Sequence, residues 1–223
     1  MNRLQSIFRN MTGAAALAAL GVSGPAAAQA RVAPAQAPAT ATPSSQLDAA
    51  VAALRGISTL RADFVQTDRN GQVVRGQLTL KRPGRIRFQY EKGVPMLIVG
   101  DGKALTLIDY EVRQVQRWPI GNSPLGALLD PRRDVARFGT LRPTGNPDVI
   151  SVEVRDRGHP EYGIITLIFQ RRASAPGGLE LVRWVALDSQ NKLTSIALSN
   201  HRYGDAVADS EFRWNDPRPR VRR

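Results

Sequence analysis

The 223-residue sequence contains no cysteine. A disulfide framework, a thiolate metal site, a thiol nucleophile and a lipid-modified N-terminal cysteine are therefore excluded. Histidine is scarce as well, because only His159 and His201 are present and neither has metal-ligand spacing around it. We expect both histidines to be ordinary surface or turn residues, and we predict no metal site.

Motifs of catalysis are also missing. The sequence has no G-x-S-x-G elbow, no H-E-x-x-H and no glycine-rich phosphate loop, and Asp101-Gly102-Lys103 is typical of a hairpin turn. The acidic residues are scattered, and no close carboxylate pair recurs on one strand face. The sequence therefore predicts a protein that is not an enzyme, with no catalytic residue and no cofactor.

Acidic residues are outnumbered, with 19 Asp and Glu against 31 Lys and Arg and a net charge of +12. Half of this net charge comes from arginines in residues 1–30 and 217–223, where no acidic residue occurs. The modestly basic remainder fits an anionic membrane surface or an acidic partner as well as a phosphate backbone. Nucleic-acid binding would require aromatic rings among the arginines, but Phe88 and Tyr90 alternate with Arg85 and Arg87 and so lie on the opposite strand face. We expect no nucleic-acid partner.

The apolar stretch from Met11 to Val22 is short, rich in alanine and followed by Gly24-Pro25. A membrane-spanning helix needs about 20 strongly apolar residues, so we interpret residues 1–30 as an export signal rather than an anchor, with cleavage after Ala30. Residues 31–45 are rich in proline, alanine and threonine, and we predict a disordered linker. The mature chain would then work outside the cytoplasm.

Residues 46–216 are enough for one domain with a real core. Apolar residues at helical spacing predict an amphipathic helix over 46–60, after which the hydrophobic period changes to two. About ten or eleven short strands with tight turns predict a largely antiparallel meander. The expected strands are 64–66, 73–81, 85–91, 96–100, 105–110, 112–118, 149–155, 164–171, 179–188, 193–199 and 210–214, with a type I′ turn at Asn70-Gly71.

The two faces of these strands differ in polarity. Ile86, Phe88 and Tyr90 point to one side, whereas the intervening Arg85, Arg87 and Gln89 point to the other. The same alternation assigns further residues to the apolar face: Val73, Leu78, Leu80, Leu105, Leu107, Val112 and Val115. We therefore expect one large curved sheet with a polar side and an apolar side whose cover is incomplete.

The strand pattern is interrupted over residues 121–138. Pro124 suits a first helical position, and Leu125, Leu128 and Leu129 form an apolar patch before Pro131 ends the helix. A second short helix is expected over 132–138. Such helices fit a mobile lid over the apolar face, and they fit a static core plug equally well.

The order of several motifs resembles the LolA family of periplasmic lipoprotein carriers. These are ISTL at 57–60, ADFVQ at 62–66, GQLTLKRP at 76–83, VGDGKAL at 99–105, GNSPL at 121–125 and FRW at 212–214, and together they extend over essentially all of residues 46–216. The resemblance implies a mainly β (α+β) fold: an open, strongly curved antiparallel half-barrel covered by a lid of short helices, with a hydrophobic cavity between sheet and lid. The arginines at 85 and 87, Thr106, Ile108 and the arginine tail at 217–223 depart from the family pattern.

The resemblance also implies a function. A family member accepts an acylated lipoprotein from an inner-membrane ABC transporter, shields its acyl chains across the periplasm and passes it to an outer-membrane acceptor, and we expect a monomer. By position, Arg82 matches the arginine that holds the lid closed. The predicted cavity and acyl-chain contacts are Phe64, Leu78, Leu80, Ile86, Phe88, Tyr90, Leu105, Leu107, Leu125, Leu128 and Leu129. A lipoprotein- or lipid-sensing module with the same half-barrel is the alternative, and a periplasmic enzyme is the weaker one.

Overall fold

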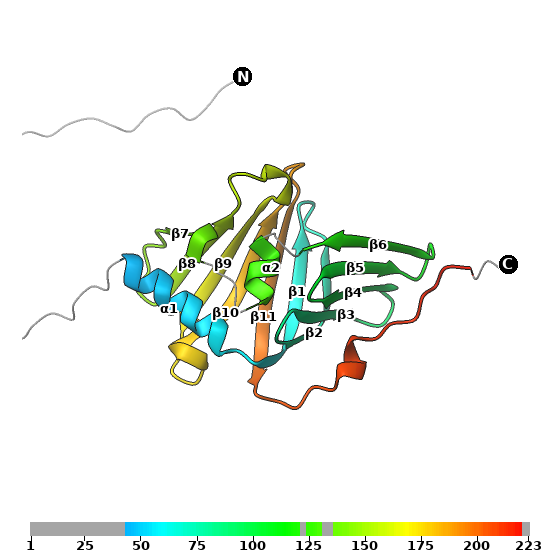
Figure 1. The fold of residues 1–223 in the computed structure, drawn as a ribbon, viewed down its shortest axis with the longest axis horizontal. Coiled ribbons are helices and arrows are strands. Elements are labelled where there is room, and N and C mark those ends of the chain that lie inside the picture. Colours follow the sequence, from blue (N-terminus) through cyan, green and yellow to red (C-terminus); the bar gives the residue numbers. More distant parts are fainter. Residues whose placement is uncertain (1–42, 121–123, 131–135, 220–223) are drawn as a thin grey trace, which may run out of the picture. The chain divides into compact units, whose positions relative to one another are not determined.

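The computed structural model describes residues 43–120, 124–130 and 136–219, and the expected signal and nearly all of the expected linker lie outside them (Figure 1). Within the described residues, eleven strands form one open antiparallel sheet in the order β6-β5-β4-β3-β2-β1-β11-β10-β9-β8-β7. The strands are β1 (Thr59–Asp68), β2 (Val73–Lys81), β3 (Arg85–Tyr90), β4 (Met96–Asp101), β5 (Ala104–Asp109), β6 (Gln114–Pro119), β7 (Gly139–Arg142), β8 (Val149–Arg155), β9 (Ile164–Arg171), β10 (Leu179–Leu187) and β11 (Leu193–Tyr203). The expected mainly β half-barrel is confirmed.

The order of the strands explains why a short helix covers one face of the sheet. The chain starts at the centre of the sheet with β1 and runs outward to the edge at β6, and β7 begins at the opposite edge. The connection between the two edges contains the short helix α2 (Pro124–Leu129) and the 3₁₀ helix η1 (Ala136–Phe138). Because this connection joins opposite edges of one sheet, it crosses a face of the sheet, and α2 lies over the central strands (Figure 1).

Helix α1 (Pro43–Gly56) begins three residues before the predicted start and ends four residues before the predicted end. Residues 43–45, which we assigned to the linker, belong to the helix, because proline is well tolerated in a first helical turn. The helix stops at glycine, a poor helix former, and Thr59 and Leu60 pair with β2 instead. The apolar stripe itself is confirmed, since Val51, Leu54 and Ile57 are buried. Helix α1 packs on β7, β8 and β10.

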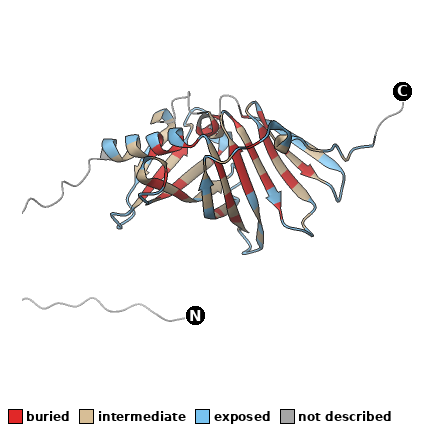
Figure 2. Ribbon diagram, turned by 90° about the horizontal axis from the view of Figure 1, so that it is seen from below, coloured by how far each residue is buried: buried red, intermediate tan, exposed pale blue. Residues whose placement is uncertain are grey.

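The face of the sheet beneath α1 and α2, here called the inner face, carries the main core (Figure 2). Phe64 is 1% exposed and its ring meets those of Phe88 and Tyr90 edge to face, at centroid distances of 5.4 and 5.3 Å. Gly76 stands opposite Phe64 in the β1–β2 ladder, and a Cβ at residue 76 would lie 2.8 Å from the Phe64 ring. The glycine therefore leaves the room that this ring occupies.

The opposite, outer face carries the predicted polar positions, and part of it is covered in a way we did not predict. Residues 204–214, here called the C-terminal strap, cross this face, and Phe212 and Trp214 pack on a second apolar cluster of Leu97, Val99 and Ile108. The expected strand at 210–214 was wrong, because η4 (Asp209–Phe212) is a 3₁₀ helix. Backbone carbonyls of the strap accept hydrogen bonds from side chains: those of Glu211 and Arg213 from Arg87, and that of Val207 from Lys81.

Ion pairs fasten the strap to the sheet. Arg61 donates to both carboxylate oxygens of Glu211 at 2.8 Å, and Asp209 pairs with Lys81 at 2.7 Å and with Arg85. The hydrogen bond from Lys81 and the pairing with Arg85 hold the pKa of Asp209 below its ordinary range. Arg85 and Arg87 thus bind a segment of the chain itself.

Several smaller expectations were wrong. Val73 and Val112 are 46% and 58% exposed, and Val115 packs on the outer-face cluster rather than the inner face. Strand β7 escaped prediction because it has only four residues. At Asn70-Gly71 a positive φ occurs at Gly71 and not at Asn70, so the turn is not type I′.

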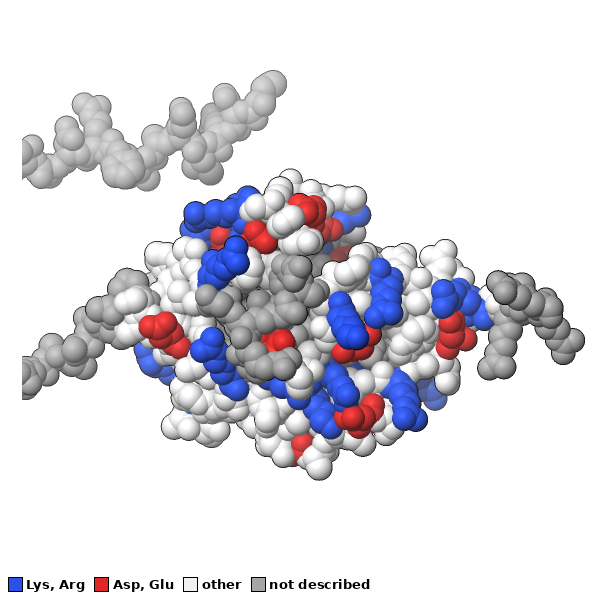
Figure 3. Space-filling model, viewed as in Figure 1, with Lys and Arg blue, Asp and Glu red and all other residues white. Residues whose placement is uncertain are grey.

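On the inner-face side of the molecule, Lys and Arg side chains have Asp and Glu side chains among them (Figure 3). In the tail, the guanidinium of Arg218 bonds the carboxylate of Asp216 at 2.6 Å, and residues 220–223 lie outside the described part. No described helix is both long enough and apolar enough to cross a membrane.

Candidate functional site

A pocket of about 240 Å³ lies between the inner face of the sheet and the two α-helices. Its described lining is apolar except for Gln66 and Arg82. The lining side chains are Leu54, Ile57, Leu60, Gln66, Leu78, Leu80, Arg82, Ile86, Phe88, Ile98, Leu105, Leu125, Leu128, Leu129, Ile165, Leu167, Leu181, Trp184, Ala186 and Ile196. Such a surface favours an apolar ligand over a polar one.

The floor of the pocket follows from strand alternation and register. Leu78 stands opposite Phe88, and Leu80 stands opposite Ile86, across the β2–β3 ladder. Directly opposed residues point to the same face, so four alternating apolar residues form one continuous patch. The roof comes from α2, where Leu125, Leu128 and Leu129 share a side of the helix.

Eight of the eleven predicted contact residues line the pocket: Leu78, Leu80, Ile86, Phe88, Leu105, Leu125, Leu128 and Leu129. Phe64, Tyr90 and Leu107 do not line it. The Phe64 ring is enclosed by its aromatic neighbours, and the Tyr90 hydroxyl donates to Gln66 Oε1 at 2.8 Å, while burial raises the pKa of Tyr90 to about 12. Leu107 is half-buried beside Ile98 on the neighbouring strand. A role for these three in acyl contact stays a prediction.

Sequence reasoning missed the six lining residues of the pocket that come from the distant strands β9 to β11, and several nearer ones. Ile165 and Leu167 of β9, Leu181, Trp184 and Ala186 of β10 and Ile196 of β11 line it, as do Leu54, Ile57 and Leu60. Trp184 meets Phe88 edge to face at 5.7 Å, which joins the two halves of the sheet. The period-two alternation within 164–171 was a usable signal, but the sequence did not show that β11 pairs with β1.

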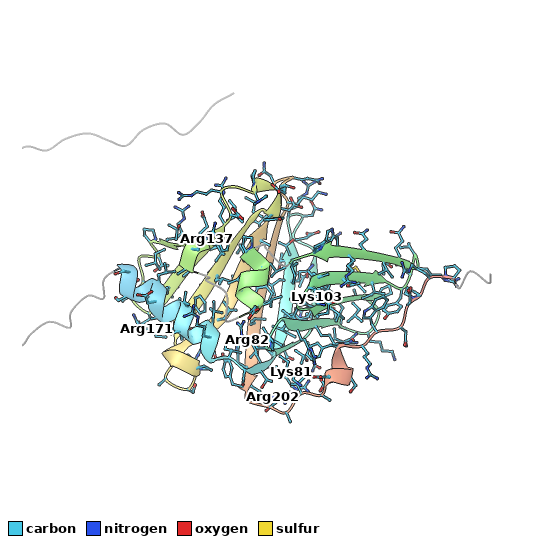
Figure 4. The ribbon with its side chains drawn as sticks, in the orientation of Figure 1. Lys81, Arg82, Lys103, Arg137, Arg171 and Arg202 are labelled. Atoms are coloured by element: carbon cyan, nitrogen blue, oxygen red, sulfur yellow. The ribbon has the colours of Figure 1, made fainter. Side chains whose placement is uncertain are left out.

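Arg82 joins the sheet to α2. Its Nη1 donates to the backbone oxygen of Leu128 at 2.7 Å, and the backbone N–H of Gly84 donates to the oxygen of Leu129 at 2.8 Å. The last carbonyls of a helix have no partner within it, so the turn after β2 supplies donors to the C-terminal end of α2. Figure 4 shows Arg82 beside this helix.

The geometry of this turn depends on glycine. Gly84 has a φ of 76°, and a Cβ there would overlap the Cα of Gly102 in the β4–β5 turn. A positive φ and this close approach both favour glycine. The backbone donor to Leu129 is thereby held in place.

The guanidinium of Arg82 is largely buried in the wall of the pocket. Burial lowers its pKa to about 10, and the negative charge of Asp130 opposes this shift. Its Nε is shielded from solvent and donates to no atom of the described chain. A charged group is thus held in an apolar wall with part of its hydrogen-bonding capacity unused.

The two histidines differ from each other. His159 is exposed, and its Nδ1 lies 2.9 Å from Glu161. His201 was wrongly expected to be an ordinary surface or turn residue: its side chain is 4% exposed, and Nε2 lies 2.9 Å from the backbone oxygen of Leu181. Among the described residues, no group of three or more His, Asp and Glu side chains is arranged to hold a metal ion.

The sequence matches one protein family and several of its named members. A family model described as "Outer membrane lipoprotein carrier protein LolA" matches residues 55–215. A protein of Chromobacterium violaceum named outer-membrane lipoprotein carrier protein is 31% identical over 192 residues, covering 82% of this chain and 87% of that protein. One of the same name from Methylobacillus flagellatus is 32% identical over 177 residues, covering 73% and 81%. The crystal structure of a LolA superfamily protein from Nitrosomonas europaea has a TM-score of 0.45 at 13% identity, covering 78% of this chain and 98% of that chain.

Proposed function

Because the chain belongs to the LolA family of outer membrane lipoprotein carriers, we propose that it carries lipoproteins by binding their acyl chains in the inner-face pocket. The observation that carries this proposal is the apolar pocket beneath α2, whose described lining includes only two polar side chains. Acyl chains need shielding from water, and the pocket offers apolar surface on both its floor and its roof.

The small size of the pocket supports the proposal that loading requires opening. A cavity of about 150 Å³ holds one benzene molecule, so a pocket of about 240 Å³ holds only a short segment of one acyl chain. A triacylated lipoprotein therefore needs a larger space than this conformation provides. Displacement of α2 would provide it, since α2 forms the roof.

Binding energies explain why partial burial suits a carrier. Burial is worth about 0.8 kcal/mol per CH₂, so about forty methylenes represent about 30 kcal/mol, whereas noncovalent affinities saturate near about 18 to 21 kcal/mol. A pocket that matched the chains fully would not release them. A carrier that uses binding energy to displace its lid binds less tightly and can pass its cargo on.

Arg82 is the proposed lid latch. Its bond to the oxygen of Leu128 connects the sheet to α2, and hydrogen bonds from charged donors contribute about 1.5 to 3 kcal/mol. Burial of the guanidinium opposes this, because lowering the pKa from 12.5 to about 10 corresponds to roughly 3 kcal/mol. The bond to Leu128 therefore offsets part of the cost of burying the guanidinium in this conformation.

In the proposed pathway the exported chain works in the periplasm after cleavage behind Ala30. It takes its cargo from an inner-membrane ABC transporter and delivers it to an outer-membrane acceptor. Loading against the affinity of the membrane requires energy, which ATP hydrolysis by the transporter would supply. Delivery then requires only an acceptor that binds the acyl chains better.

Depletion of the protein in the organism that encodes it tests the proposal. We expect outer-membrane lipoproteins to accumulate in the inner membrane within a few generations, measured by membrane fractionation and immunoblotting. An unchanged distribution of lipoproteins after full depletion would contradict the carrier function.

Complementation of the depleted strain tests the latch. Arg82→Leu should leave the fold intact and fail to restore lipoprotein sorting, because the sheet loses its side-chain bond to α2. Arg117→Leu is the matched control, since Arg117 is an exposed arginine on β6 that pairs with Asp101 and does not line the pocket. Equal sorting by both variants would remove Arg82 from the mechanism.

A further inference from the structure

The Arg82 guanidinium has donors that the closed protein does not use. Among the described residues, the Nε of Arg82 and the hydroxyl of Tyr203 are the buried side-chain polar atoms without a hydrogen-bond partner. A buried donor left unpaired costs free energy, and Arg82 lines the same pocket that α2 covers. An acceptor that enters this pocket would reach this donor once α2 or the guanidinium moves, because Nε is shielded in the present conformation.

Opening the lid increases the demand for an acceptor. Nη1 of Arg82 bonds Leu128 of α2, and Asp130, whose charge stabilises the guanidinium, directly follows α2. Displacement of α2 would remove the acceptor and the counter-charge together. The guanidinium would then need a new acceptor, which either water or a bound ligand can supply.

We propose that Arg82 exchanges its lid carbonyl for the carboxylate of a free fatty acid, whose chain occupies the inner-face pocket. This inference rests on the proposed function, because it needs the pocket to accept acyl chains. A guanidinium presents several N–H donors in a planar fork that matches a carboxylate, and the unused Nε belongs to that fork. A carboxylate is favoured over a phosphate because it is smaller and carries a single charge, so less charge has to be desolvated.

The volume of the inner-face pocket is consistent with one acyl chain as its first occupant. The closed pocket of about 240 Å³ accepts a short apolar segment, and a free fatty acid requires less lid displacement than a triacylated cargo. The protein would thus bind free fatty acids as ligands in addition to lipoproteins.

The test compares three ligands that share a twelve-carbon chain and differ in the head group: laurate, dodecyl phosphate and 1-dodecanol. Their affinities for the purified exported protein are measured by calorimetry below their solubility limits. We expect laurate to bind about tenfold more tightly than dodecanol, because charge-assisted hydrogen bonds are stronger than neutral ones. Dodecyl phosphate should bind more weakly than laurate.

Variants assign this preference to Arg82. Arg82→Gln should abolish the tenfold preference for laurate while dodecanol still binds, and Arg82→Lys, which keeps the charge but loses the fork, should retain part of the preference. Lys103→Gln is the control for a general positive potential, since Lys103 is exposed in the turn whose Gly102 contacts Gly84 and does not line the pocket. It should leave the preference unchanged. If Arg82→Gln does not fold, the comparison of Arg82→Lys with Lys103→Gln tests the role of Arg82. The preference for laurate should fall in Arg82→Lys and stay unchanged in Lys103→Gln.

The outcomes separate this inference from the proposed function. If wild-type protein binds none of the three ligands, the proposal that the inner-face pocket binds acyl chains is wrong. Equal binding of laurate and dodecanol, or a preference that persists in Arg82→Gln, overturns the role of Arg82 and leaves the pocket standing. Tighter binding of dodecyl phosphate than of laurate overturns the choice of carboxylate.

Discussion

Filling the inner-face pocket with a side chain should stabilise the protein. Ala186 lines the pocket from β10 and stands opposite Ile165 of β9 and Thr194 of β11. Ala186→Phe adds a ring of benzene size, and benzene fits a cavity of about 150 Å³, less than the 240 Å³ available. Filling of cavities commonly adds about 0.5 to 2 kcal/mol of unfolding free energy, and phenylalanine suits a strand better than alanine.

The assay is thermal and urea unfolding followed by circular dichroism. For a domain of this size, 1 kcal/mol shifts Tm by about 2 to 4 °C, so we expect Tm of Ala186→Phe to rise by about 1 to 8 °C. Laurate binding should fall at the same time, because the ring occupies the acyl site.

Two control variants show whether a gain in stability comes from filling the pocket. Ala62 is 4% exposed in the inner-face core but does not line the pocket, so Ala62→Phe should destabilise by about 1 to 3 kcal/mol through overpacking. Ala197 is half-buried on β11 and does not line the pocket, so Ala197→Phe should change stability by less than about 0.5 kcal/mol. A loss of stability in Ala186→Phe comparable to that of Ala62→Phe would refute the reasoning, since it would mean that the pocket is filled or collapsed in solution.

Three further predictions concern the core, the strap and Tyr90. Phe64→Ala should lower the unfolding free energy by about 3 to 5 kcal/mol in urea titration, because it empties a site that is 1% exposed; a loss below about 1 kcal/mol would contradict the central position of this ring. The strap should be held less firmly at low pH, because the pKa of Asp209 is lowered by the hydrogen bond from Lys81. Its contribution is present above the ordinary aspartate pKa of about 3.9 and disappears as the pH falls through the lowered value. Tryptophan fluorescence reports this step, which should be absent in Trp214→Phe, and a step unaffected by that substitution would disprove the assignment. Burial raises the pKa of Tyr90 to about 12, so stability should fall by roughly 2 to 3 kcal/mol between about pH 10 and pH 12. Tyr90→Phe should lose less stability over the same interval, and an identical pH profile would contradict this.

The inner face of β3 shows what alternation alone predicts well. Ile86, Phe88 and Tyr90 are buried and Gln89 is exposed, as the period of two requires. The same alternation predicted the apolar face that forms the floor of the pocket, and helical spacing predicted the apolar patch at Leu125, Leu128 and Leu129 that forms its roof. These features are local, since each depends on spacing within one element. That a cavity lies between them was implied only by the family resemblance.

The long-range pairing of strands could not be predicted from the sequence. Strand β1 pairs with β11, which lies more than a hundred residues away, and this pairing brings Trp184 and Ile196 into the same pocket as Phe88. Periodicity contains no information on which strands become neighbours. The contribution of β9 to β11 to the site was therefore missed.

The strap was misjudged for a different reason. Phe212 and Trp214 alternate with polar residues, as in a strand, and they do pack on an apolar face. The backbone nevertheless bonds arginine and lysine side chains instead of a neighbouring strand. The acidic residues Asp205, Asp209 and Glu211 opposite a basic sheet face were a visible signal of this arrangement.

The most direct test of acyl binding in the inner-face pocket uses a photoreactive fatty acyl chain. A lipopeptide with a diazirine near the chain terminus is bound to the purified protein, irradiated, and the labelled residues are mapped by mass spectrometry. The labels should fall on α2 and on the inner-face residues of β2, β3 and β10. Labels concentrated on the outer-face cluster beneath the strap, or spread evenly over the surface, would contradict the account.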